Sequence, residues 1–500
     1  MSDLESSADA TDAQLPAAAK QKAVDPARPA GAGDSRDGIR TGRLRRTAPL
    51  VGLTARTAGE AVVVGLRSRL TGTDASEFHV RTAERYAELL GRSKGALMKA
   101  GQLLSFTSIG PVVGDEFRSI YQRALVRLRD NAPPMAPELA REVLERELGA
   151  TAESVFAEFR WEPLAAASIG QVHSARLHDG RAVAVKLQYP GVAAAIDADL
   201  KNSELLATFL GLLFGISPRK VSFDVRGAAR ELGERISEEL DYRLEAANQK
   251  EFAERYREHP CIHVPEVVGE LSGERVLVQE LVEGKTWTQA LAAEQELRDS
   301  WAEAIHRFTY GSYHYFYVFN ADPHPGNYIF HDDGSVSFLD FGCVKRLRRR
   351  EVDALNLVMR ECLRGDVRET WRASVDGGFF EADAPLTPEE VLAYWRSPIE
   401  MYWAEQPFTI TPEYVARLIE LRYSPSGPSA NVFSEMVTPV AYTIMSRLDI
   451  GVMSLIAELR ARNYWADIAA EYFEGADPTT AMGKVDRTHL QERLKARSHA

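Results

Sequence analysis

Two polar motifs in the middle of the chain contain residues suited to phosphoryl transfer. Asp322 and Asn327 bound the loop Asp-Pro-His-Pro-Gly-Asn, and Asp340 begins an Asp-Phe-Gly tripeptide. Phosphoryl transfer requires a group that orients the nucleophile and a divalent metal that bridges the phosphates, and Mg²⁺ prefers hard oxygen ligands. We therefore expect Asn327 and Asp340 to hold Mg²⁺, and Asp322 to orient or deprotonate the attacking hydroxyl.

Each motif also has a plain structural interpretation, in which Asp322 is a turn residue and Asp340 ends a strand. Either motif alone occurs often by chance. Together they follow the order of a kinase catalytic loop and its metal-binding tripeptide, and a hairpin expected around Asp332-Asp333-Gly334 separates them. Because the combination is fairly specific, we favour the catalytic interpretation.

A third element is the segment Val183-Ala-Val-Lys186, which resembles the kinase strand whose lysine holds the α- and β-phosphates of ATP. It follows Asp179-Gly180, a two-residue hairpin signal. Such a lysine needs a carboxylate partner, and Asp241 and Glu245 lie on one face of an expected helix. The alternatives are a surface lysine on a strand and a solvated acidic helix face.

The loop expected to cover the nucleotide is rich in alanine instead of glycine. Glycines allow a backbone to approach phosphate closely, whereas alanine methyl groups restrict that approach. This loop must therefore hold nucleotide differently from an ordinary kinase loop. The residues that we expect at the nucleotide are Ala165, Ala166, Ala167, Ser168, Ile169, Gly170, Gln171, Val172, Lys186, Glu245, Glu280 and Leu281.

The elements that must position these residues change character along the chain. Strand-like alternation over 171–188 and 275–281 follows a helical region and precedes a longer helical region, which predicts an α+β fold with two unequal lobes. The expected divisions are a disordered tail over 1–47, a helical extension over 48–150, a β-containing N-lobe over 151–282, a helical C-lobe over 283–480 and a charged tail over 481–500.

The composition restricts the class of protein. The chain has 500 residues, is 45% hydrophobic and carries a formal net charge of −12, which argues against nucleic acid as a partner. Its three cysteines form no paired motif, so a reducing compartment is expected. The acidic start lacks a signal sequence and no apolar run is long enough to span a bilayer. We expect a cytoplasmic protein, with peripheral contact to the inner face of a membrane as a further possibility.

Taken together, these residues resemble the UbiB/AarF family of atypical kinase-like proteins, which includes mitochondrial Coq proteins. The resemblance covers about residues 87–344 and rests on several motifs. They are Lys99-Ala-Gly-Gln102, the alanine-rich stretch from Ala165 to His173, Glu239-Leu-Asp241, the loop from Asp322 to Asn327, and Asp340-Phe-Gly342. One departure is Asn320, where the family often has His. An Asn there can still hydrogen-bond the loop backbone.

The resemblance implies a protein-kinase-like fold in which Lys186 pairs with Glu245 and contacts the phosphates. It also implies that Lys99 and Gln102 lie on a regulatory helix near Glu239 and Asp241, where a protein substrate would otherwise dock. From the sequence alone, Lys99 could equally be interpreted as a surface lysine on an amphipathic helix. Family members look like ATPases or small-molecule kinases linked to isoprenoid-quinone or lipid metabolism.

Three functional hypotheses follow. The leading one is an atypical kinase or ATPase that binds Mg-ATP, acts in isoprenoid-quinone (ubiquinone) or lipid metabolism, and contacts an anionic lipid or lipid-like substrate. The second is a nucleotide-binding scaffold that regulates a lipid-biosynthesis complex. The third, a protein kinase acting in trans, is disfavoured because helix-forming sequence begins at Arg348 and leaves no room for a long activation loop. No motif specifies an oligomeric state.

Overall fold

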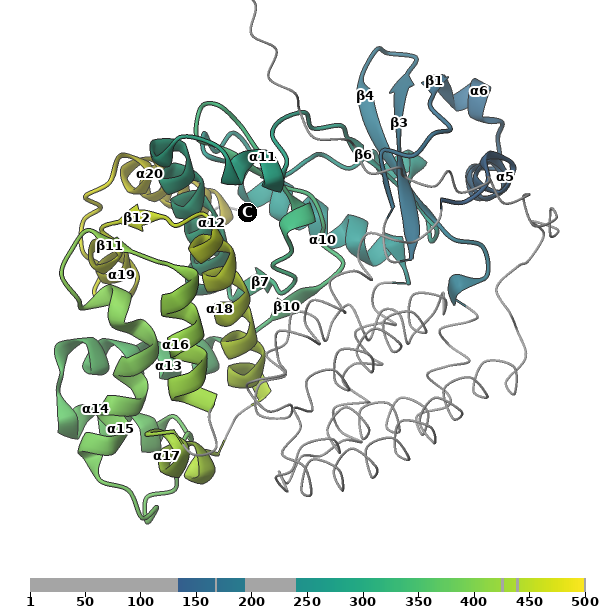
Figure 1. The fold of residues 1–500 in the computed structure, drawn as a ribbon. Coiled ribbons are helices and arrows are strands. Elements are labelled where there is room, and N and C mark those ends of the chain that lie inside the picture. The colour runs from purple at the N-terminus through teal and green to yellow at the C-terminus, as the bar shows by residue number, and fades with distance from the viewer. Residues whose placement is uncertain (1–133, 167–168, 194–239, 424–426, 438–439, 499–500) are drawn as a thin grey trace, which may run out of the picture. The chain divides into compact units, whose positions relative to one another are not determined.

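The computed structural model describes residues 134–166, 169–193, 240–423, 427–437 and 440–498, and every structural statement below concerns these ranges (Figure 1). Several sequence-based expectations lie outside them. These are the tail over 1–47, the extension over 48–133, and the site residues Lys99, Gln102, Ala167, Ser168 and Glu239.

The first part of the described chain is a five-stranded antiparallel sheet. Its strands are β1 (Phe156–Phe159), β2 (Ala165–Ala166), β3 (Gly170–Leu177), β4 (Ala182–Gln188) and β6 (Val276–Glu280). β3 and β4 form the hairpin predicted at Asp179-Gly180, where Gly180 has φ +90°, a conformation that favours glycine. Both faces of β4 are largely covered, so its burial does not simply alternate.

Three helices and short pieces of structure flank this sheet in the sequence. They are α5 (Pro137–Leu148), α6 (Ala152–Val155), α10 (Tyr242–Arg255), the strand β5 (Ile262–His263) and the 3₁₀ turn η1 (Gly269–Leu271). Asp241 caps α10 by accepting a hydrogen bond from the Arg243 backbone N–H at 3.0 Å, which satisfies a donor that the first helical turn leaves open. The cap fixes where α10 begins, and hence where its first turn places Glu245.

The second part is mostly helical and contains two small sheets around the Asp322–Asn327 loop and the Asp-Phe-Gly tripeptide. Helices α11 (Trp287–Leu291) and α12 (Gln295–Phe316) precede β7 (Val318–Asn320), the 3₁₀ turn η2 (Pro325–Asn327), β8 (Tyr328–Phe330), β9 (Val336–Phe338) and β10 (Val344–Arg346). β8 and β9 form the hairpin predicted around Gly334, and β5 joins β9 in parallel. β7 pairs with β10 in antiparallel fashion.

The remaining elements are nearly all helices, as the sequence predicts. They are α13 (Arg349–Arg364), α14 (Val367–Asp376), α15 (Pro388–Arg396), η3 (Ser397–Tyr402), β11 (Phe408–Thr409), α16 (Pro412–Tyr423), α17 (Ala430–Glu435), α18 (Val440–Glu458), β12 (Arg462–Asn463), α19 (Trp465–Phe473) and α20 (Ala481–Ser498). α13 begins three residues after β10, so the short connection expected after the Asp-Phe-Gly tripeptide is present. The α+β fold class is confirmed. Within the described ranges, every helix is too short or too polar to cross a membrane.

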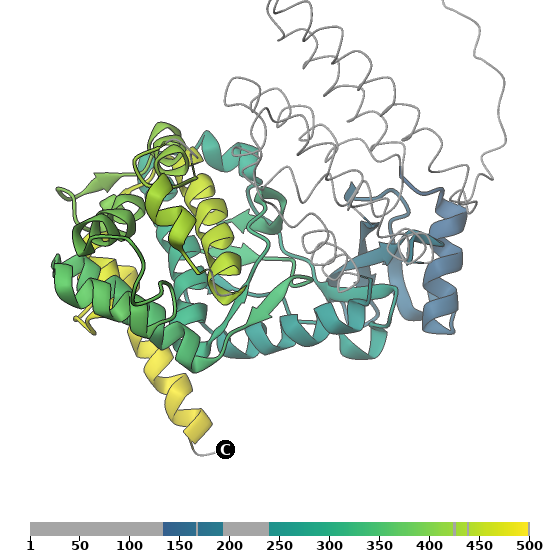
Figure 2. The same cartoon turned by 90° about the horizontal axis from the view of Figure 1, so that it is seen from below.

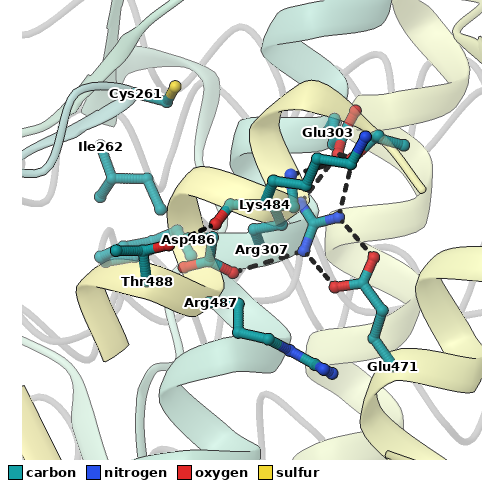
Figure 3. Close-up of polar contacts among 12 residues, drawn as sticks. Cys261, Ile262, Glu303, Arg307, Glu471, Lys484, Asp486, Arg487 and Thr488 are labelled. Atoms are coloured by element: carbon teal, nitrogen blue, oxygen red, sulfur yellow. Dashed lines mark hydrogen bonds and ion pairs between the residues drawn. The ribbon is translucent and has the colours of Figure 1, made fainter. Parts of the chain in front are cut away.

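The segment expected to be a charged tail is a helix that is anchored in the C-terminal region. α20 places Asp486 beside the buried guanidinium of Arg307 on α12, at 3.4 Å, and Glu471 of α19 contacts the same guanidinium at 2.9 Å (Figure 3). Glu303 lies one helical turn before Arg307 and completes the group at 2.8 Å. Although burial disfavours the charged form, the carboxylates raise the pKa of Arg307. The later part of α20 extends to Ser498, near the end labelled C in Figure 2.

Candidate active site

The β7–β10 strand pair brings the two polar motifs together. Asn320 is paired with Val344, and the Ala321 backbone N–H donates to the Cys343 carbonyl at 2.7 Å. The loop that begins at Asp322 therefore leaves β7 beside the Asp-Phe-Gly segment that leads into β10. The β8–β9 hairpin closes the connection, since the Leu339 N–H donates to the Asn327 carbonyl at 3.0 Å.

Lys186 of β4 makes ion pairs with carboxylates from two distant segments. Its Nζ lies 2.9 Å from Glu245 Oε1 on α10 and 2.9 Å from Asp340 Oδ2 after β9. The Glu245 side chain is almost fully buried, whereas Asp340 is about one-third exposed. Burial alone would favour the neutral amine, but Asp340 and Glu245 together raise the pKa of Lys186 well above its usual value. Lys186 is therefore a fixed cation at this site.

Asn320 connects the catalytic-type loop to Asp340 through the backbone. Its Oδ1 accepts a hydrogen bond from the Asp322 N–H at 3.1 Å, and its Nδ2 donates to the Asp340 carbonyl at 2.5 Å. The ability to hydrogen-bond the loop backbone, expected for Asn at this position, is therefore realised. The second bond, to Asp340, was not expected from the sequence.

Asp322 and Asn327 face each other across their loop. Asn327 Nδ2 donates to Asp322 Oδ2 at 3.1 Å, and this contact turns the amide oxygen of Asn327 away from Asp322. His324 accepts from the Gly326 N–H at 2.9 Å through Nδ1, so its side chain shapes the turn. Asp340 Oδ1 accepts a hydrogen bond from the Gly342 N–H at 3.0 Å, which holds the Asp340 carboxylate in place.

The tripeptide is anchored by residues that the sequence analysis did not single out. Phe341 is fully buried, with its ring centroid 5.0 Å from that of Phe252 on α10 and 6.3 Å from that of Phe308 on α12. Asn248 of α10, one turn after Glu245, donates to the Phe341 carbonyl at 3.1 Å. α10 therefore positions Lys186 through Glu245 and the Asp340 segment through Asn248 and Phe252. In the sequence, the signal for this role is an Asn three residues after Glu245, on the same face of the helix.

The expected nucleotide loop divides between the two faces of the sheet. Val172 is paired with both Lys186 and Ala165, so these side chains share the face that carries the ion pairs. Gln171 occupies the opposite face because strand residues alternate, and it is paired with Leu187. Its buried amide accepts from the Met135 N–H at 2.8 Å and contacts His173 at 2.8 Å. Any contact of Gln171 with nucleotide would therefore come from its backbone.

Gly170 is required by packing. A Cβ there would lie 2.1 Å from the Leu187 carbonyl oxygen and 2.9 Å from the Tyr242 hydroxyl. Ile169 is buried beside it, whereas Ala165 and Ala166 of β2 are exposed. The exposed alanines, and not Gly170, are thus the described loop residues with surface free toward a ligand.

Glu280 ends β6, the edge strand that pairs with β4, and Leu281 follows directly after it. Glu280 is paired in register with Val183 and makes a 3.1 Å contact with His263, which lowers the pKa of the Glu280 carboxyl. The Leu281 N–H donates to the Ala182 carbonyl at 3.1 Å. These contacts hold the end of β6 in place.

The donors at this site fit Mg²⁺ better than a transition metal. Asp340 would supply a carboxylate oxygen and Asn327 an amide oxygen, which are hard donors of the kind that Mg²⁺ prefers. Over the described ranges, no three His, Cys, Asp or Glu side chains are grouped closely enough to form a metal cage. Mg²⁺ usually completes its shell with water and substrate phosphates, so such a small protein donor set is sufficient.

A family model and the most similar curated proteins all point to one family of atypical kinases. The pattern of the ABC1 atypical kinase-like domain matches residues 127–374. Protein ACTIVITY OF BC1 COMPLEX KINASE 1, chloroplastic, of Arabidopsis thaliana is 32% identical over 61% of this chain and 44% of its own length. Atypical kinase COQ8B, mitochondrial, of Rattus norvegicus is 31% identical over 66% of this chain and 60% of its own length. The chain therefore spans less than two thirds of the length of these curated relatives.

A solved structure is similar over more of its length. The complex of Rv3197 with erythromycin from Mycobacterium tuberculosis has a TM-score of 0.57 and 31% sequence identity, and the match covers 77% of this chain and 93% of that one. At this identity and coverage, the similarity concerns both the sequence and the fold.

Proposed function

This chain belongs to the ABC1 atypical kinase-like family, and on that premise we propose that it is an atypical kinase or ATPase that binds Mg-ATP. The observation that carries the proposal is the contact of Lys186 with both Glu245 and Asp340. The three side chains come from β4, α10 and the segment after β9, and a fold with no phosphate to bind has no need to bring them together. Such an arrangement is what a kinase lysine and its metal-binding aspartate require.

The roles of the residues follow from their contacts. Lys186 supplies a fixed positive charge for the phosphates, and Glu245 holds it in place. Asp322 is oriented by Asn327 and by the backbone bond to Asn320, so its carboxylate is available to orient an acceptor hydroxyl or water. Asp340 and Asn327 would hold Mg²⁺, which would bridge the phosphates and neutralise charge that develops during transfer.

The acceptor is proposed by analogy with the family. We propose that the protein acts in isoprenoid-quinone or lipid metabolism, in the cytoplasm and in peripheral contact with an anionic lipid surface, and that it does not phosphorylate proteins in trans. The short connection between β10 and α13 supports the last point, because it contains no extended segment on which a peptide could dock.

The test is ATP turnover with Mg²⁺ in the presence and absence of vesicles that contain anionic lipid. We expect Asp340→Asn to reduce turnover at least about 100-fold, since a metal ligand is lost. Asp332→Asn is the matched control, because Asp332 is an exposed carboxylate paired with Lys285. Equal turnover in the wild type and Asp340→Asn would refute the proposal. Thermal stabilisation by ATP without turnover in either protein would instead support a nucleotide-binding scaffold.

A further inference from the structure

Two adjoining cavities lie among the helices of the C-terminal region, away from the site described above. The inner cavity has a volume of about 110 Å³ and is lined mainly by α18, α16, η3 and α12. The outer cavity has a volume of about 250 Å³. Leu355 of α13 and Tyr442 and Met445 of α18 line both, so the cavities share a wall. None of the phosphate-site residues lines either cavity.

The lining of the inner cavity suits a flexible aliphatic chain. It includes four methionines, Met359, Met401, Met445 and Met453, together with Leu, Ile and Val side chains. Unbranched thioether side chains adapt to irregular apolar shapes, and they are frequent on surfaces that bind varied apolar partners. A rigid planar ligand would have no need of so adaptable a wall.

The same cavity contains polar groups without partners. Both ring nitrogens of His314 and the hydroxyl of Tyr442 are buried and have no hydrogen-bond partner in the described structure. Burial lowers the pKa of His314 to about 3, so the ring is neutral and offers one donor and one acceptor. An unsatisfied buried polar group is costly, which makes two of them in one cavity an indication of a ligand or of water.

The charges in the inner cavity balance. Asp449 accepts a hydrogen bond from the Tyr310 hydroxyl at 2.9 Å. The guanidinium of Arg422 lies over aromatic rings, 5.5 Å from that of Tyr442 and 5.1 Å from that of Tyr394. One acid and one base therefore face the cavity with no excess charge, so an ionic ligand would gain little there.

We propose that these cavities form a second binding site, which takes an uncharged single-chain amphiphile with a hydroxyl group, such as an aliphatic alcohol. The hydroxyl bonds with Tyr442 at the shared wall, and the chain lies among the methionines. The inner volume is smaller than the roughly 150 Å³ of a cavity that binds benzene, so the chain fills the inner cavity and the hydroxyl end of the ligand lies where the two cavities adjoin. The inference goes beyond the proposed phosphoryl transfer and does not depend on it.

The binding test uses the native fluorescence of Trp395, which lines the inner cavity. Titration with 8-bromooctan-1-ol should quench this tryptophan in a saturable way, because bromine quenches at short range. In Trp395→Phe the saturable component should disappear. Filling the shared wall with Met445→Phe or Leu355→Phe should weaken binding at least about 10-fold. Leu386→Phe, on a partly buried side chain outside both cavities, should bind like the wild type.

A second measurement identifies the role of the hydroxyl and uses a mild variant. Octan-1-ol should compete with the brominated probe about 10-fold better than 1-fluorooctane, whose fluorine neither donates a hydrogen bond nor accepts one of appreciable strength. In Tyr442→Phe this preference should fall to near unity while the protein remains folded, since the lost hydroxyl had no partner. Non-saturable quenching, or equal competition by the two compounds with wild-type protein, would overturn the proposal and leave water as the occupant.

Discussion

Gly451 of α18 lies directly against the ring of Pro323, the residue that follows Asp322. A methyl group on Gly451 would come within 2.4 Å of Pro323 Cγ, closer than atoms in contact can approach. α18, which lines both cavities of the C-terminal region, therefore also supports the loop that carries Asp322. We predict that Gly451→Ala displaces this loop and lowers the ATP turnover number about 10-fold, with a smaller effect on the apparent KM for ATP.

The matched control for this substitution is Gly311→Ala. Gly311 is also helical, but the nearest atom to an added Cβ lies 3.8 Å away, which is ordinary contact. Both changes should favour the helix by up to about 1 kcal/mol through propensity alone. The same turnover in both variants would show that contact between α18 and the loop has no part in catalysis.

The ion pairs of Lys186 predict a loss of both function and stability. In Lys186→Met the buried Glu245 carboxylate loses its cation and remains close to that of Asp340. Removing one partner of a buried pair typically costs about 3–5 kcal/mol, so chemical denaturation should show a large decrease in the free energy of unfolding. ATP binding, measured under conditions where the variant is folded, should also be lost. Lys285→Met, which removes an exposed pair with Asp332, should change both quantities little.

The two hydrogen bonds of Asn320 predict a selective effect on catalysis. Asn320→Ala removes the links to the Asp322 N–H and the Asp340 carbonyl without touching a proposed metal ligand. We expect turnover to fall about 10-fold while Mg-ATP affinity, measured by titration calorimetry, stays within about twofold. Asn320→His, which introduces the residue common in the family, should retain more activity than Asn320→Ala. If the alanine variant turned over at the wild-type rate, the bridge would be structural only.

Asp449 predicts a pH-dependent penalty on stability. Burial raises the pKa of this carboxyl to about 6, above the value of about 4 in an unfolded chain. The folded state therefore holds a proton that the unfolded state has already lost between about pH 4 and pH 6, so this group lowers stability as the pH rises through that window. Asp449→Asn keeps an acceptor for Tyr310 and should stabilise the protein by on the order of 2 kcal/mol at pH 7. Thermal unfolding at pH 7 and pH 4 should show this gain at pH 7 only.

The cluster around Arg307 predicts that α20 is required for folding of the C-terminal region. Arg307→Met leaves Glu303, Glu471 and Asp486 as buried carboxylates without their cation, and should lower the free energy of unfolding by roughly 3–5 kcal/mol. Arg493→Met is the control, since Arg493 pairs with Glu254 at a more exposed position of the same helix. Similar denaturation midpoints for the two variants would contradict the prediction.

Local sequence was sufficient to predict the hairpins and to indicate the candidate phosphate-site residues. The turns at Asp179-Gly180 and at Gly334 need a residue with positive φ, and both glycines adopt it. A glycine at such a position can be recognised from the turn residues alone. The order of Lys186, Asp322, Asn327 and Asp340 along the chain likewise indicates a chemistry without three-dimensional information. Each hairpin turn and each short motif involves residues within a few positions of one another, which is why a sequence pattern can report it.

The partners of those residues were decided by tertiary structure. Glu245 and Asp241 were both candidates for Lys186, and the cap on α10 uses Asp241 for the helix start while Glu245 faces the lysine. The bond from Asn248 to Phe341 joins residues 93 apart, and that from Arg307 to Asp486 joins residues 179 apart. The inner and outer cavities are lined by helices that lie far apart in the sequence of the C-terminal region. Contacts and voids of this kind arise only when separate elements pack, because the free energy that selects them comes from burial between elements and not from any local preference of the chain.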